Sequence, residues 1–185
     1  KNEYLGVPME GFCECMSEKL DKEAEIVVQL LDKMNFTVST AESCTGGLIS
    51  AEITSAAGAS KVFELGICTY SERIKNEYLG VPMEVINAHG VVSREVAFSM
   101  VRGLKERSGA DVCISVTGVA GPGGGTPQTP VGTVYIGFDI CGEQFVRLLP
   151  LDGIPELNRQ SIRQSAALYA LSTVKQALLE AIKEQ

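Results

Sequence analysis

The sequence has one histidine, no Cys-x-x-Cys pair and no surplus of basic residues. A structural metal site needs several Cys or His ligands at set spacings, so His89 and six scattered cysteines do not predict one. The net charge of −7 argues against a nucleic-acid partner, because such proteins present a basic face. The apolar runs are far shorter than the ~20 residues of a membrane span, and no signal-peptide pattern occurs. We therefore expect a reduced cytoplasmic protein with no metal and no membrane partner.

The composition is that of an ordinary soluble domain. Hydrophobic residues make up 45% and charged residues 21% of the 185 positions, which is enough apolar material for one sizeable core. Apolar periodicity predicts helices over 17–35, 45–56, 71–79, 93–109 and 155–183. Apolar or alternating runs predict strands over 36–41, 62–70, 112–116, 131–140 and 143–149.

The order of these segments defines the expected fold class. Strands alternate with helices, and the last two strands read as an antiparallel hairpin across Cys141-Gly142. This pattern predicts an α/β three-layer sandwich with a mixed, largely parallel sheet and one antiparallel hairpin. In such folds, ligands collect at the carboxyl ends of the strands, where Ser43, Tyr70 and Thr117 are expected to meet.

A perfect ten-residue repeat lies outside this pattern. Residues 1–10 recur letter for letter at residues 75–84, but the flanking residues differ. We interpret it as a local duplication, not as a solenoid repeat. Only the second copy continues a strand–helix pattern, so function is assigned to that copy. Residues 1–16 are expected to form an irregular arm, and residues 17–185 to form the domain.

The stretch from residue 36 to residue 47 is the strongest candidate for chemistry. It predicts a buried strand, then Ser43, then a helix opening at Thr45 with Gly46 and Gly47. A serine between a strand end and a helix N-terminus can bind an anion or act as a nucleophile, and the glycines allow close approach. Alternatively, Ser43 and Thr45 only compete to cap the helix.

The glycine-rich segment 117–126 follows a strand expected to be buried on both faces. It lacks the Gly-Lys-Ser/Thr ending of a P-loop, which argues against nucleoside triphosphate hydrolysis. Its position favours a binding role, although such a pattern also serves as a flexible connection.

A base for Ser43 has to be found without a histidine partner. Lys75 lies five residues after Tyr70, at the border of the inward face of its helix. It is either an ordinary solvated lysine or a desolvated base, which requires lowering its pKa from ~10.4 to near 7. His89, in what reads as a polar turn, is the weaker candidate. Arg159 and Arg163, one helical turn apart, could clamp a phosphate or form surface ion pairs.

Five separated motifs together resemble the CinA C-terminal domain family over roughly residues 20–183. They are Ala41-Glu-Ser-Cys-Thr-Gly-Gly47, Thr69-Tyr70 with Lys75 and Leu79-Gly-Val81, Gly90-Val-Val-Ser93, Thr117-Gly-Val-Ala-Gly-Pro122 and Pro130-Val-Gly-Thr-Val134. The resemblance implies a nicotinamide-nucleotide amidohydrolase that converts nicotinamide mononucleotide and water to nicotinate mononucleotide and ammonia. It implies Ser43 as nucleophile and Lys75 as its base, with Tyr70 and Thr117 in the active site, and no cofactor.

The expected partners follow from the same resemblance. We expect a small pyridine nucleotide as ligand and a homo-oligomer as the assembled form. The residues expected to contact the substrate are Thr45, Gly46, Gly47, Gly118, Gly121, Gly123, Gly124, Arg159 and Arg163. Two positions depart from the family pattern: Thr129 replaces a usual lysine, and Asn158 replaces a usual aspartate. A non-catalytic nucleotide-binding module, associated with competence or DNA damage, is the alternative function.

Overall fold

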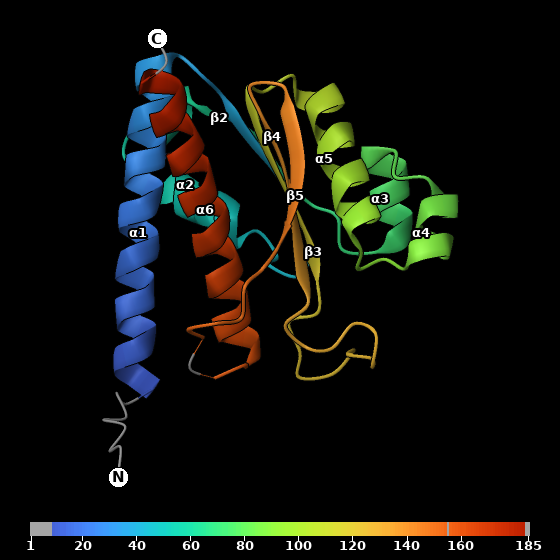
Figure 1. The fold of residues 1–185 in the computed structure, drawn as a ribbon. Helices are drawn as coiled ribbons and strands as arrows, with labels where there is room; N and C mark the ends of the chain where they lie inside the picture. Colours follow the sequence, from blue (N-terminus) through green and yellow to red (C-terminus); the bar gives the residue numbers. More distant parts are fainter. Residues whose placement is uncertain (1–8, 155, 184–185) are drawn as a thin grey trace.

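The computed structural model describes residues 9–154 and 156–183. A five-stranded sheet lies between two layers of helices, which confirms the predicted three-layer α/β class (Figure 1). In chain order the elements are α1 (Met9–Met34), β1 (Val38–Glu42), α2 (Leu48–Ser55), the 3₁₀ turn η1 (Ala59–Lys61), β2 (Phe63–Cys68), α3 (Glu72–Leu79), α4 (Met83–His89), α5 (Arg94–Ser108), β3 (Val112–Gly118), β4 (Val134–Ile140), β5 (Glu143–Leu148) and α6 (Arg159–Lys183).

The sheet has the strand order β2-β1-β3-β4-β5. Strand β1 pairs in parallel with β2 and with β3, whereas β4 is antiparallel to both β3 and β5. Strand β5 therefore points the same way as the first three, so the sheet is mixed but largely parallel, with one hairpin. Strands β2, β1 and β3 are neighbours and end at Cys68, Glu42 and Gly118, which places the segments that follow them at one edge.

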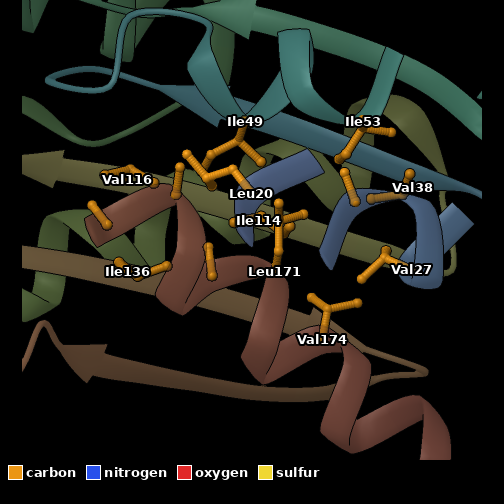
Figure 2. Packing of buried hydrophobic residues seen from close by; sticks show 14 of the residues in the cluster. Leu20, Val27, Val38, Ile49, Ile53, Ile114, Val116, Ile136, Leu171 and Val174 are labelled. Carbon is orange, nitrogen blue, oxygen red and sulfur yellow. The ribbon is translucent and has the colours of Figure 1, made fainter. Parts of the chain in front are cut away.

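The larger core fills the space between the sheet and helices α1, α2 and α6. Figure 2 shows Ile114, Val116 and Ile136 of the sheet facing Leu171 and the other labelled apolar side chains of this layer. Side chains alternate along a strand, so the residues between them face the opposite layer. There Cys113 joins a second cluster with α3, α4 and α5, and Ser115 donates a hydrogen bond to the carbonyl of Ala97 in α5. Strand β3 is therefore covered on both faces and buried at nearly every position.

Several predicted boundaries are wrong. Helix α2 begins at Leu48 and strand β4 at Val134, each about three residues later than predicted, because the chain still turns through glycines with left-handed φ angles just before them. Helix α1 begins at Met9, within the predicted irregular arm, because residues 9–16 contain no proline and the buried Met16 extends the apolar stripe toward Leu20. Residues 83–89 form α4, although no helix was predicted there and His89 was expected in a polar turn. A proline is well tolerated at a helix start, and the carbonyl of Pro82 accepts hydrogen bonds from the N–H groups of Val85 and Ile86. Helix α6 begins at Arg159, later than predicted.

Residues 1–8, which make up most of the first decapeptide copy, lie outside the described residues. Within the described part of the chain, no helix combines the length and the apolar character that crossing a membrane requires.

Candidate active site

The turn after β1 fixes the backbone of Ser43. The N–H of Ser43 donates to the carbonyl of Val116 in β3, and the N–H of Gly46 donates back to the carbonyl of Ser43. Gly46 and Gly47 have φ angles of 62° and 92°, in the left-handed region that favours glycine. The chain can therefore reverse within four residues and enter α2, leaving the Ser43 side chain at the carboxyl edge of the sheet.

Lys75 reaches this edge from α3. Its helix is capped by Ser71, whose side chain accepts a hydrogen bond from the N–H of Ile74. The Lys75 side chain is fully buried, not at the helix border as the sequence suggested. Its Nζ lies 3.1 Å from Ser43 Oγ, 2.8 Å from the carbonyl oxygen of Thr69 and 3.2 Å from that of Tyr70.

These three contacts suit a neutral amine as well as an ammonium. Two carbonyl oxygens can only accept, so they hold two N–H groups of Lys75. The third position faces a hydroxyl, which can donate to the lone pair of an amine. Burial lowers the pKa of Lys75 from 10.5 to about 8, and interactions with Cys44 and Glu72 oppose this shift only in part. Lys75 is thus arranged to take a proton from Ser43.

The neighbouring thiol is not a competing nucleophile. Cys44 is buried and lines the same pocket, and burial raises its pKa to about 11. A thiol needs to be a thiolate to react, so Cys44 stays inert near neutral pH. Three further free cysteines lie away from the pocket lining: Cys68 and Cys141 are exposed and Cys113 is buried.

A pocket of about 250 Å³ opens directly over the Ser43–Lys75 pair. It is bounded by the turn after β1, by the segment between α4 and α5, by the glycine-rich segment after β3 and by the start of α6. Its lining residues are Ser43, Cys44, Tyr70, Lys75, Val91, Val92, Thr117, Gly118, Val119, Ala120, Gly121, Gly123, Gly124 and Arg159.

The glycine-rich segment contributes free backbone donors. It runs from the end of β3 around the lower end of the sheet in Figure 1. Across its base, the N–H of Val119 donates to the carbonyl of Thr133, and the N–H of Gly132 donates to the carbonyl of Val119. Among the described residues, no acceptor meets the N–H groups of Ala120, Gly121, Gly123 and Gly124. Unpaired N–H groups beside a pocket favour an anion or a developing oxyanion.

The two candidate arginines occupy different environments, although they are one turn apart on α6. Arg159 lines the pocket, donates to the carbonyl of Gly121 at 2.8 Å and approaches the hydroxyl of Tyr70 at 3.4 Å. Arg163 instead donates to the carbonyl of Thr45 at 2.7 Å, behind the turn. Of the two, Arg159 alone is among the residues that line the pocket, and contact of both arginines with one ligand stays a prediction.

The structure brings together most of the residues selected from the sequence. Ser43, Lys75, Tyr70, Thr117, Arg159 and four glycines of the segment 118–124 all line the pocket. The hydroxyl of Thr117 donates to the carbonyl of Val91 at 2.8 Å, which ties β3 to the segment before α5. Tyr70 is 63% exposed and forms the rim.

Four other selected residues lie outside the pocket lining. Thr45 is fully buried, Gly46 and Gly47 shape the turn, and Arg163 is bonded to the carbonyl of Thr45. Neither Ser43 nor Thr45 caps α2: the N-cap residue is Gly47, with no side-chain cap of its own. The exposed His89 lies in α4, with Nδ1 3.8 Å from Glu95, and lines no part of the pocket.

The sequence reasoning missed two sets of residues. Val91 and Val92 line the pocket, and their signal was present because Gly90-Val-Val-Ser93 had been noted without a role. Glu42 was missed completely: it is fully buried and accepts hydrogen bonds from the start of α2. A carboxylate inside an apolar strand, one residue before the candidate nucleophile, was the available signal.

The two departures from the family pattern have local roles here. Asn158 caps α6, with its Oδ1 accepting from the N–H of Ser161 at 2.9 Å, a task that an aspartate also performs. Thr129 is bonded to Thr126 through the side chains of both residues. Within the described chain, no three His, Cys, Asp or Glu side chains gather closely enough to hold a metal ion.

Comparison with known proteins places this arrangement in a family. The sequence model of the CinA C-terminal domain matches residues 20–178, which include every residue of the pocket. The chain belongs to the CinA C-terminal domain family. It is 48% identical over 155 residues to a CinA-like protein of Kosmotoga olearia, and 44% identical over 155 residues to a CinA-like protein of Dictyoglomus thermophilum. Both matches cover 84% of this chain.

Solved structures of the CinA superfamily share the fold. The competence/damage inducible protein CihA from Agrobacterium tumefaciens has a TM-score of 0.81 and 36% identity, over 86% of this chain and 95% of that one. A CinA superfamily protein from Klebsiella pneumoniae has a TM-score of 0.80 and 27% identity, over 87% and 98%. The chain spans only 37% of the length of the two curated relatives, which are therefore much longer proteins.

Proposed function

We propose that this CinA-family protein hydrolyses the carboxamide of nicotinamide mononucleotide, giving nicotinate mononucleotide and ammonia. The observation that supports this most is the buried Lys75 amine, 3.1 Å from Ser43 Oγ under a pocket. With a pKa of about 8, roughly one-tenth of Lys75 is neutral at pH 7, compared with a negligible fraction for a lysine at its usual value. A neutral amine in hydrogen-bond contact with a serine is the arrangement that a Ser–Lys amidase needs.

The first half of the reaction releases ammonia. The Ser43 Oγ–H gives its proton to Lys75 Nζ while Oγ bonds to the carboxamide carbon, forming a tetrahedral oxyanion. When this intermediate collapses, the C–N bond breaks and Lys75 returns its proton to the departing nitrogen. Ammonia leaves, and the pyridine acyl group remains as an ester on Ser43.

The second half regenerates the enzyme. Water attacks the ester carbon while Lys75 accepts one of its protons. Collapse of this second intermediate breaks the bond to Ser43 Oγ, which takes the proton back from Lys75. The product leaves as a carboxylate.

Different groups at the pocket are suited to the two negative charges of the reaction, the tetrahedral oxyanion and the substrate phosphate. The free N–H groups of Ala120, Gly121, Gly123 and Gly124 are candidates for holding the oxyanion and part of the nucleotide. The net charge of −7 gives no long-range attraction for a phosphate, so its recognition has to be local. Arg159 is the arginine at the pocket, and we assign the phosphate contact to it.

Ammonia release from nicotinamide mononucleotide by the purified protein tests the proposal, with Ser43→Ala as the matched variant. Loss of the nucleophile should lower kcat on the order of 10⁴-fold or more, while substrate binding and the thermal midpoint stay close to wild type. Retention of more than about a tenth of the activity by Ser43→Ala would exclude Ser43 as nucleophile. Tight binding of the nucleotide by wild type with no ammonia released would instead favour the non-catalytic module.

A further inference from the structure

The carboxylate of Glu42 is buried immediately before the candidate nucleophile. Its side chain is fully inaccessible to solvent at the last position of β1. Oε2 accepts from the N–H groups of Gly47 at 3.0 Å and Ile49 at 3.1 Å. Oε1 accepts from the N–H of Ser50 at 2.9 Å and from its hydroxyl at 2.8 Å. A buried charge with four donors around it is satisfied on both oxygens.

These donors belong to the first turn of α2, where N–H groups lack partners within the helix. Gly47 at the N-cap has no side chain to satisfy them, and α2 has no acidic residue in its first turn. Glu42 supplies the missing acceptors from the preceding strand and puts a negative charge at the positive end of the helix dipole. The N-terminus of α2 is therefore already occupied by an internal anion.

This arrangement clamps Ser43 from both sides. Behind Ser43, Glu42 is held in the sheet by pairing with Cys68 and with Val116. Ahead of Ser43, the first turn of α2 is bonded to the Glu42 side chain. The intervening turn cannot shift without breaking one of these two attachments. Because proton transfer needs hydrogen-bond distance, a displacement of about 1 Å is sufficient to slow catalysis by about 100-fold.

We infer that Glu42 is a positioning residue that holds Ser43 Oγ within reach of Lys75 Nζ by tying the N-terminus of α2 to the end of β1. This inference rests on the proposed hydrolytic function of Ser43. Glu42 does not line the pocket, so it does not contact the substrate.

The variant Glu42→Gln is the sharpest test, because it keeps the size of the side chain and removes half of its acceptors. An amide has one oxygen, and its NH₂ group would face N–H donors. We expect kcat on nicotinamide mononucleotide to fall by about 10- to 100-fold with KM changed by less than about threefold. Glu64→Gln, an exposed position in β2, removes the same charge and should leave both constants unchanged. An unchanged kcat in Glu42→Gln would overturn the inference.

A second readout does not depend on the substrate. In a crystal structure of Glu42→Gln, the distance from Ser43 Oγ to Lys75 Nζ should exceed hydrogen-bond range, compared with 3.1 Å here. A retained contact would contradict the positioning role even if the protein were less stable. If the wild-type protein releases no ammonia, the proposed function fails. The distance from Ser43 Oγ to Lys75 Nζ in Glu42→Gln still tests whether Glu42 positions Ser43.

Should Glu42→Gln not fold, Ser50→Ala provides a milder version of the same test. It removes one of the four hydrogen bonds to Glu42 and the 2.6 Å contact with Thr40. We expect kcat per folded molecule to fall by about threefold, with KM unchanged. A fall in the thermal midpoint alone, with wild-type kcat, would assign Glu42 to stability and not to positioning.

Discussion

Two glycine-containing turns face the pocket, and they differ in where their backbone hydrogen bonds go. In the turn from Ser43 into α2, the N–H groups of Gly46, Gly47 and Ile49 donate to Ser43 or to Glu42. In the segment after β3, the N–H groups at 120, 121, 123 and 124 have no acceptor within the described residues. The first turn holds Ser43 with its own backbone donors satisfied, and the second turn leaves its backbone donors open to a ligand.

A glycine-rich helix start is therefore not by itself an anion-binding site. The backbone N–H groups have to be traced to their acceptors before a binding role is assigned. On this basis, changes on the Ser43 side should alter kcat or stability, and changes on the 118–124 side should alter KM. The following predictions test that division.

The largest effect is expected at Lys75, on the Ser43 side. Lys75→Arg keeps a positive charge but cannot lose its proton, and Lys75→Met keeps the stem without a base. Both should lower kcat by about 10²- to 10⁴-fold, because a general base is lost, with little change in the affinity for the nucleotide. Steady-state kinetics and equilibrium binding measure the two quantities. Substantial activity in Lys75→Arg would mean that another group serves as base.

Variants of the two arginines on α6 should affect different quantities, because Arg159 lines the pocket and Arg163 contacts the turn after Ser43. Arg159→Ala should raise KM for nicotinamide mononucleotide by about 10- to 100-fold, the value of one charge-assisted hydrogen bond, with a smaller change in kcat. Arg163→Ala should leave KM within about threefold and lower the free energy of unfolding by about 1 kcal/mol, because its bond to Thr45 is lost.

The phosphate-free riboside is the control for the arginine prediction. If Arg159 reads the phosphate, Arg159→Ala should lose far less activity on the riboside than on the mononucleotide. Equal losses on both substrates would show that Arg159 does not contact the phosphate. Equal increases in KM for the two arginine variants would contradict the assignment of substrate binding to the 118–124 side alone.

The smallest effects concern two glycines. Gly47 has a φ of 92°, and an added Cβ would lie 3.4 Å from Cys68 Sγ, so Gly47→Ala should lower the free energy of unfolding by about 1–2 kcal/mol. Gly123 has open space around its Cβ position, so Gly123→Ala should fold normally. Because Gly123 lines the pocket, we expect its KM to rise about 10-fold. Chemical denaturation and kinetics on both variants distinguish these outcomes.

Sequence alone predicted the fold well where periodicity was strong. The apolar run Val112–Val116 correctly indicated a strand covered on both faces, and alternation across Cys141-Gly142 correctly indicated the hairpin. It failed where a boundary depends on tertiary contacts. Met16 extends α1 because it packs in the core, and α4 follows Pro82 because that segment covers α5 through Ile86. Neither contact is visible in local propensity.

For the candidate site, too, some features were predictable from the sequence and others were not. Strand ends brought Ser43, Tyr70 and Thr117 to one edge, as parallel-sheet topology predicts. The different surroundings of Arg159 and Arg163 could not be predicted, because helical spacing puts both on one side of α6. Their partners, Gly121 and Thr45, come from turns far away in sequence. Glu42 was missed for the same reason, since its role depends on where α2 begins.

The pH dependence of kcat/KM reports directly whether neutral Lys75 activates Ser43. The lowered pKa of Lys75, about 8, means that the base is protonated below this value and neutral above it. We predict that kcat/KM for nicotinamide mononucleotide rises about tenfold per unit below about pH 8 and reaches a plateau above it. The substrate phosphate titrates near pH 6, about two units away, so the two ionisations can be separated. A profile that is flat between about pH 7 and pH 9, or that falls as pH rises through 8, would contradict Lys75 as the base.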